Sequence, residues 1–159
     1  MSRFVFVLCS LVLLASAAMA QGKIDTKWQC QKPTEEHHFN VGDTPDHTYG
    51  IAQGSCSAAS SGKGFAEKTG AYTEFDEGWK ASMTGHGRFN VTMDSGDKVY
   101  YTYETSGSTE AGKPASNKWK ITSGTGKYKG VKASGTCSGK RAGDGSSTWE
   151  CSGTYSMSK

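Results

Sequence analysis

Polar and apolar residues alternate strictly along the middle of the chain. From Trp79 to Met93 every odd position is apolar or Gly, and every even position is polar. Such a period of two is typical of a half-buried β-strand, because successive side chains of a strand point to opposite faces. Gly85 and Gly87 predict a bend within this strand. We therefore expect a long strand with one apolar face and one wet face.

The same alternation recurs along the rest of the chain, between segments rich in turn residues. Residues 94–97 and 142–145 are typical of tight hairpin turns, and residues 33–47 form the longest irregular stretch. Antiparallel strands with one apolar face can close into a barrel, which leaves no exposed edge. The pattern thus predicts an all-β, eight-stranded antiparallel β-barrel, with a two-sheet β-sandwich as the alternative. The expected strands are 23–31, 48–58, 64–77, 78–94, 97–109, 116–123, 131–140 and 146–157.

The composition also restricts the fold class. All four leucines lie within the first 14 of the 159 residues, so the rest of the chain contains none. The rest of the chain has few aliphatic residues, and its bulk comes from Trp, Tyr and Phe set among many Gly, Ser and Thr. Helical bundles depend on Leu-rich stripes, and buried parallel sheets depend on Val, Ile and Leu. The composition argues against both and favours antiparallel β-structure with an aromatic interior.

The N-terminus has the three parts of a secretory signal peptide. Arg3 supplies a positive start, residues 4–14 are apolar, and residues 18–20 form an A-x-A cleavage site. We expect residues 1–20 to be removed, which leaves residues 21–159 as a single β-barrel domain. The apolar stretch is short for a membrane span. The mature protein is therefore expected to be secreted or periplasmic, with no membrane insertion after signal removal.

Four cysteines remain beyond the signal, and an even count in an exported chain indicates two disulfides. Cys137 and Cys151 lie symmetrically about a predicted hairpin turn, and Cys30 and Cys56 belong to the first two strands. If the last strand closes on the first, a Cys30–Cys151 bond leaves the other two cysteines roughly 14 Å apart, which is beyond disulfide reach. The prediction is Cys30–Cys56 and Cys137–Cys151, a disulfide-stabilised barrel.

Candidate chemistry is sparse. His37, His38 and His47 lie in the irregular stretch among carboxylates and are weak candidates for a metal site, but adjacent histidines point apart, so we expect no metal and no cofactor. On the six clear alternating strands the apolar face carries no ionisable residue. The less regular strand 64–77 is the exception, because its acidic residues cannot be assigned to a face; they are Glu67, Glu74, Asp76 and Glu77.

We expect the polar faces of the strands to be exposed to solvent and not to bind a large partner. The formal net charge is only +3, and the lysines of the C-terminal half fit a solvated face. Most aromatic residues lie on the faces opposite these charges, so we expect no binding of nucleic acid. Asn90 begins an N-V-T sequon, which matters only where the source organism glycosylates exported proteins.

One segment points to a family. Residues 121–131, ITSGTGKYKGV, followed by Gly135, resemble a recurring element of the allene oxide cyclase/dirigent-like β-barrel superfamily, in which a strand ends in a G-x-G-x-[YF]-x-G turn. The resemblance implies a barrel of a small secreted bacterial type, with Tyr128 plugging one end. Members include cyclases, dirigent proteins and proteins without assigned activity. The interior acidic residues of the enzymatic members match no position in this sequence.

The interior expected from these patterns favours binding over catalysis. We expect a secreted non-enzymatic barrel that holds a small apolar or aromatic ligand, or serves as a structural extracytoplasmic module. Gly85 and Gly87 leave space for such a ligand. Its expected neighbours are Trp79, Met83, Phe89, Tyr101 and Trp119. The alternative is a cyclase or isomerase of the allene oxide cyclase/dirigent type, with an acidic residue on strand 64–77 supplying the acid–base chemistry that such reactions need.

Overall fold

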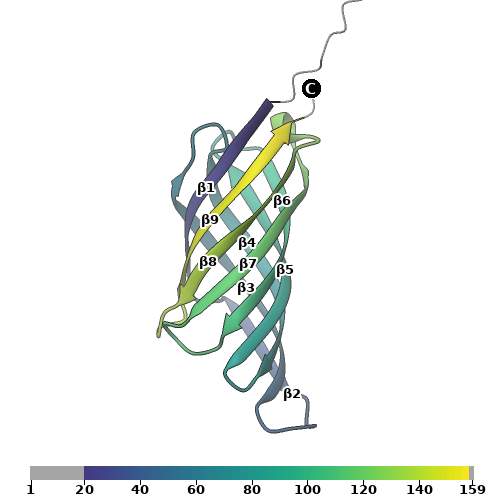
Figure 1. Ribbon diagram of the computed structural model, residues 1–159, viewed down its shortest axis with the longest axis vertical. Coiled ribbons are helices and arrows are strands. Elements are labelled where there is room, and N and C mark those ends of the chain that lie inside the picture. Colours follow the sequence, from purple (N-terminus) through teal and green to yellow (C-terminus); the bar gives the residue numbers. More distant parts are fainter. Residues whose placement is uncertain (1–19, 158–159) are drawn as a thin grey trace, which may run out of the picture.

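The computed structural model describes residues 20–157, which fold into nine β-strands and one short 3-10 turn (Figure 1). All neighbouring strands run antiparallel. The elements are β1 (Ala20–Cys30), β2 (Glu35–Asn40), β3 (His47–Ser61), β4 (Glu67–Trp79), β5 (Ser82–Met93), β6 (Lys98–Ser108), β7 (Pro114–Gly124), η1 (Gly126–Tyr128), β8 (Lys132–Arg141) and β9 (Ser147–Met157).

The sheet closes into a barrel through its first strand. Strand β1 pairs with β9 on one side and with β3 on the other, so that β1 and β3 to β9 form a closed ring of eight strands. The strands cross the barrel at a strong tilt, as closure requires (Figure 1). The predicted all-β, eight-stranded antiparallel barrel is confirmed, and the sandwich alternative is wrong.

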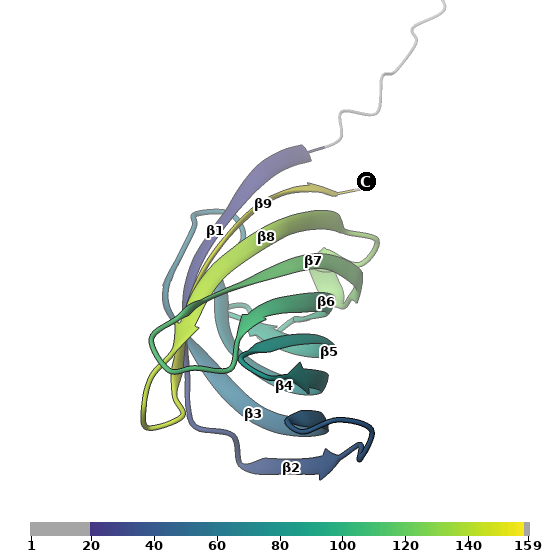
Figure 2. The same cartoon turned by 60° about the horizontal axis from the view of Figure 1, so that its bottom comes forward.

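Strand β2 is the ninth strand, and it lies outside the ring. The sequence pattern placed residues 33–47 in an irregular stretch, and this is corrected: residues 35–40 pair with the first half of β3, whereas β1 pairs with the second half. The alternation rule misses β2 because none of its six side chains is buried. Strand β2 extends one end of the molecule, opposite the end where β1 begins and β9 finishes (Figures 1 and 2).

The predicted strand 78–94 is also corrected, because the chain reverses within it. Strand β4 ends at Trp79, β5 begins at Ser82, and Lys80 takes a positive φ of 56° in the two-residue turn between them. A two-residue turn places residue i opposite residue i+3, as observed for Trp79 and Ser82. Odd positions therefore face inward in β5 but outward in β4, apart from Glu67, which precedes a register shift. Trp79 consequently lies on the outer surface, 43% exposed.

One half of the barrel is filled by side chains. Phe65, in the β3–β4 loop, and Tyr128, in η1, are 0% and 1% exposed, and their rings meet edge to face at 5.1 Å. Ile24, Met93 and Val99 are buried with them. This core lies at the end where β1 begins and β9 finishes, and the buried Tyr128 ring lies where the turn motif predicts an aromatic plug.

Two disulfides join neighbouring strands in the pairing predicted from the sequence. Cys30 is bonded to Cys56 between β1 and β3, and Cys137 to Cys151 between β8 and β9. In each case the two cysteines are direct partners in the strand register. Stable disulfides are consistent with an extracytoplasmic location.

The predicted signal peptide lies outside the described residues, except for Ala20. Within residues 20–157, no helix has the length and apolarity needed to cross a membrane.

Candidate functional site: a cavity in the open half of the barrel

The half of the barrel opposite the packed core encloses a cavity of about 240 Å³. Its lining includes the exposed side chains Lys113 and Arg141 at the end where β2 extends, so the cavity reaches the surface there. Its inner lining is aromatic and acidic. The principal lining residues are Trp28, Ala52, Tyr72, Glu74, Asp76, Met83, Phe89, Tyr101, Tyr103, Asn117, Trp119 and Trp149.

The cavity stays open because the aromatic rings lie flat against the barrel wall. A Cβ atom added to any of several inward glycines would overlap a ring from an adjacent strand or, at Gly153, from the next strand but one. The pairs are Tyr72 on Gly54, Phe89 on Gly70, Tyr103 on Gly87, Trp119 on Gly135 and Gly153, and Trp149 on Gly139. Rings that cover glycines bury their faces without extending to the barrel axis, so bulky residues enclose space instead of filling it.

Glu74 is the central ionisable group of the cavity. It lies on the inward face of β4, and the hydroxyl of Tyr103 on β6 donates a hydrogen bond to its carboxylate. Burial raises the pKa of Glu74 to about 7, the nearby charge of Asp76 adds to this, and the Tyr103 hydrogen bond opposes it. Burial likewise raises the pKa of Tyr103, which keeps its hydroxyl protonated. Glu74 can therefore give or take a proton near neutral pH.

A second set of charged groups lies where the cavity opens. Asp76 faces inward two residues beyond Glu74, and its pKa is raised, chiefly by burial. From β2, the Glu36 carboxylate contacts His38 and Arg141, each at 3.2 Å. The Arg141 contact connects the outer strand β2 to the end of β8. The mouth of the cavity thus carries the carboxylates of Glu36 and Asp76, the imidazole of His38, the ammonium of Lys113 and the guanidinium of Arg141, which is already paired with Glu36.

Glu67 occupies the boundary between the cavity and the packed core. Its carboxylate accepts hydrogen bonds of 2.5 Å from the hydroxyls of Thr26 and Tyr101. All three side chains are buried. Burial raises the pKa of Glu67 despite these two bonds. With both partners already in place, Glu67 forms the polar floor of the cavity, and Glu74 is the group with access to its interior.

Two buried polar atoms on β7 have no partner among the residues that the structure describes. They are the Oδ1 atom of Asn117 and the Nε1 atom of Trp119, and both residues line the cavity. A buried polar atom without a hydrogen bond costs about 1–3 kcal/mol, and native proteins rarely leave one unsatisfied without a reason. One acceptor and one donor are therefore available to a molecule inside the cavity.

The structure brings together four of the five residues expected at a ligand site. Met83, Phe89, Tyr101 and Trp119 all line the cavity. Trp79 does not, because the β4–β5 turn places it on the outer surface.

Sequence reasoning missed the inward orientation of the acidic residues of β4. Glu67, Glu74 and Asp76 face inward, and Glu77 faces outward. One feature of the sequence does indicate this orientation: Gly70, Tyr72 and Gly78 lie at even positions, as Glu74 and Asp76 do. Phe75 and Trp79 suggest the opposite orientation, because they are apolar and yet lie at odd positions on the outer face.

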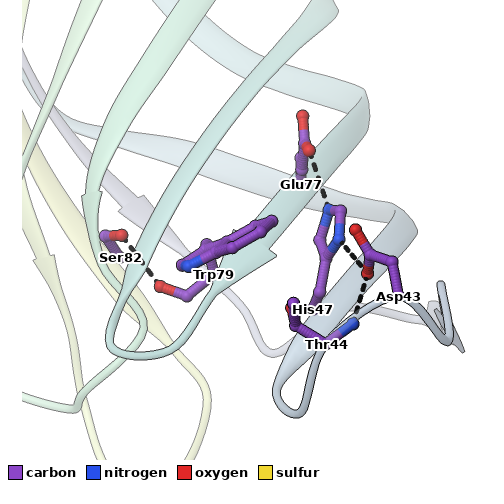
Figure 3. A network of polar contacts seen from close by, with 6 residues as sticks. All are labelled: Asp43, Thr44, His47, Glu77, Trp79 and Ser82. Carbon is purple, nitrogen blue, oxygen red and sulfur yellow. Dashed lines mark hydrogen bonds and ion pairs between the residues drawn. The ribbon is translucent and has the colours of Figure 1, made fainter.

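The three histidines considered as metal ligands lie in different environments. His47 is 5% exposed and lies between two carboxylates: its Nδ1 is 2.7 Å from Asp43, and its Nε2 is 2.8 Å from Glu77 (Figure 3). The Trp79 ring packs against it at 4.4 Å. His38 contacts Glu36 and His37 contacts Glu35. Among the described residues, no group of three or more His, Cys, Asp or Glu side chains is arranged to hold a metal ion.

The His47 cluster has a structural explanation. Burial lowers the pKa of His47, but the hydrogen bonds and charges of Asp43 and Glu77 outweigh burial, and the net effect is a raised pKa. The hydrogen bond from His47 lowers the pKa of Asp43. These contacts connect the β2–β3 turn to β4, and both ring nitrogens of His47 are engaged. The cluster holds the extended end of the molecule together, outside the cavity.

Comparisons with known proteins do not assign the site. No family model matches the chain, and no curated protein matches it.

Proposed function

We propose that this protein is a secreted or periplasmic β-barrel that binds one small, largely aromatic molecule in the open half of its interior. The observation that carries this proposal is the presence, in one aromatic cavity, of a buried acceptor on Asn117 and a buried donor on Trp119 without partners. A ligand that satisfies both atoms removes an energetic cost that the empty protein bears. Export is supported by the signal-like N-terminus and by the two disulfides.

The size and lining of the cavity also favour a ligand. A dry cavity of about 150 Å³ can hold benzene, so the 240 Å³ found here has room for one ring with a short substituent. The rings of Trp28, Phe89 and Trp119 provide faces and edges for stacking against such a ring. Small-molecule sites typically combine an apolar wall with a few polar groups that fix orientation, and this cavity has both.

Membership of the allene oxide cyclase/dirigent-like superfamily is part of the proposal. It is supported by the G-x-G-x-Y-x-G turn at residues 124–130 and by the burial of Tyr128 at the closed end of the barrel. A ligand cavity inside a small exported barrel fits the binding and cyclase members of that group equally well.

Binding is tested by titrating the disulfide-intact protein with phenethyl alcohol while following tryptophan fluorescence, because three tryptophans line the cavity. We expect saturable binding that Ala52→Leu weakens by about tenfold or more, since the added carbons occupy cavity volume. The matched control is Ala71→Leu, at an exposed position of β4, which leaves binding unchanged. Absence of saturable binding, or equal binding by both variants, contradicts the proposal.

We propose a second function on the strength of Glu74: isomerisation of an unsaturated ligand by proton transfer. A carboxyl group with a pKa of about 7, held by Tyr103 inside an aromatic cavity, can remove a proton from one carbon of a bound molecule and return it to another. Such a step moves a proton and a double bond within one molecule, so no co-reactant is needed. This is the role that the alternative hypothesis gave to an acid on strand 64–77.

The isomerase proposal is tested with a β,γ-unsaturated cyclic ketone, whose conjugated isomer absorbs in the ultraviolet. We expect the protein to accelerate conversion and Glu74→Gln to abolish the acceleration while still binding phenethyl alcohol. Glu104→Gln, at an exposed position of β6, is the control and keeps full activity. If Glu74→Gln isomerises the ketone as fast as the parent protein, the function is binding alone.

A further inference from the structure

Two carboxylates inside the cavity lack a cation. Glu74 and Asp76 lie two residues apart on the inward face of β4, and both line the cavity. Among the residues that the structure describes, neither forms an ion pair with a lysine, arginine or histidine. Arg141, whose charge lowers the pKa of both carboxylates, is hydrogen-bonded to Glu36 instead. A buried carboxylate without a positive partner is costly, so this part of the cavity favours a positive charge.

The groups facing the two carboxylates do not supply that charge. From β6, Tyr103 donates a hydrogen bond to Glu74, and Tyr72 lies nearby on β4. From β2, Glu36 adds negative charge. His38 acts on Asp76, and Arg141 acts on both carboxylates, only through space, and Lys113 at the cavity mouth forms no ion pair with either of them. Burial therefore raises the pKa of both carboxylates, with added repulsion from Asp76 on Glu74 and from Glu36 on Asp76. An ammonium group between them would reverse that effect and hold both in their charged forms.

The rest of the cavity fits the apolar part of the same molecule. The Trp28 and Phe89 rings meet edge to face at 4.9 Å, and the Tyr101 and Trp119 rings at 5.5 Å. Aromatic faces attract cations as well as other rings. The unpartnered Asn117 Oδ1 is a hydrogen-bond acceptor, which an N–H group can satisfy.

We propose that the ligand of this barrel is an organic amine with a single aromatic ring, bound as its ammonium ion between Glu74 and Asp76. This inference rests on the proposed function, since it names the class of molecule that the cavity holds. The ammonium lies toward the open end of the cavity, and the ring lies among the aromatic residues deeper inside. The two carboxylates thus supply the specificity, and the aromatic wall supplies the apolar contact.

The test compares three probes of matched size: phenethylamine, phenethyl alcohol and phenylpropionate. Each is titrated into the disulfide-intact protein near neutral pH by calorimetry. We expect the amine to bind at least about tenfold tighter than the alcohol, as one charge-assisted hydrogen bond warrants, and the carboxylate to bind weakest. Repeating the amine titration in buffers of different ionisation enthalpy should reveal proton release, because the ammonium shifts Glu74 toward its ionised form.

Two variants separate this inference from the proposed function. The double variant Glu74→Gln, Asp76→Asn should lose the preference for the amine yet keep its affinity for the alcohol, whereas Glu104→Gln should change neither. Equal binding of amine and alcohol, or strongest binding of phenylpropionate, overturns the amine assignment and leaves the binding function standing. Failure of all three probes to bind overturns both.

Discussion

The hydroxyl of Tyr103 reaches the carboxyl group of Glu74 across strand β5, because the residue between them is a glycine. Glu74 on β4 and Tyr103 on β6 are both direct register partners of Gly87. The Tyr103 ring occupies the space that a side chain at position 87 would take. The absence of a single Cβ atom therefore allows a buried acid and its hydrogen-bond donor to meet inside the barrel.

Gly87→Ala should separate the two groups. The added Cβ would overlap the Tyr103 ring and lie 2.6 Å from the carbonyl oxygen of Thr73, so the ring must move. We expect a loss of about 1–3 kcal/mol in the free energy of unfolding, measured with denaturant. We also expect the Glu74 pKa to rise above 7, because the hydrogen bond that lowers it is lost. Gly143→Ala is the control, since nothing lies within 4 Å of its Cβ position, and it should change neither quantity.

The stability of the protein should depend on the protonation of Glu74. Folding raises the pKa of this group from 4.5 to about 7, so the folded state binds its proton more tightly than the unfolded state does. The stabilisation that this proton provides is complete below pH 4.5 and is lost as the pH rises to about 7. The free energy of unfolding therefore falls by an amount on the order of 3 kcal/mol over this range. Glu74→Gln has no such titrating group and should not lose this stabilisation. The free energy of unfolding of the variant minus that of the parent protein should therefore increase between about pH 5 and pH 8. Parallel pH profiles for the two proteins would show that Glu74 has an ordinary pKa.

His47 should titrate above its usual range. Its raised pKa comes from Asp43 and Glu77, whose hydrogen bonds outweigh burial. The resulting stabilisation is present below about pH 6.5 and is lost as the pH rises through the pKa of the folded state. Asp43→Asn and Glu77→Gln should each lower the pKa of His47, measured from its ring protons by NMR. Asp25→Asn, at an exposed position of β1, is the control and should leave it unchanged. Unaltered titration in both cluster variants would refute the assigned cause.

The disulfide that closes the barrel should contribute more than the hairpin disulfide. Cys30–Cys56 spans 26 residues and joins the two strands that complete the ring, whereas Cys137–Cys151 spans only 14. Chain-entropy arguments assign about 3.5 kcal/mol to the first and about 3 kcal/mol to the second. Paired Cys→Ala variants compared by denaturant unfolding test this order. A larger loss on removing Cys137–Cys151 would contradict it.

The barrel was predictable from the sequence because most of its strands have one dry face. The alternation along residues 82–93 and 147–157 directly reflects inward and outward side chains. Strand β2 was not predictable, because it lies outside the ring, where both of its faces meet solvent. Trp79 was misplaced because the alternation of β5 continues by chance through the two-residue turn before it. Across that turn the inward-facing positions change from even numbers in β4 to odd numbers in β5.

The aromatic half of the site was predictable, and the acidic half was not. Met83, Phe89, Tyr101 and Trp119 follow from alternation alone. Strand β4 resists the same rule, because its inward face carries Glu74 and Asp76 while its outward face carries apolar Phe75. Hydrophobicity fails as a guide to orientation where an interior is built for polar contact. The orientation of β4 became clear only from its pairing with β3 and β5.

Native mass spectrometry of the protein purified from its own host shows whether the open half of the barrel holds a small molecule. We expect a folded species that carries the mass of one bound small molecule above the two-disulfide polypeptide, and that loses this mass on unfolding. Ala52→Leu protein from the same host should lack this excess, and Ala71→Leu protein should retain it. A folded protein at the bare polypeptide mass that also fails to bind phenethyl alcohol would show that the barrel is not a binding site for such molecules.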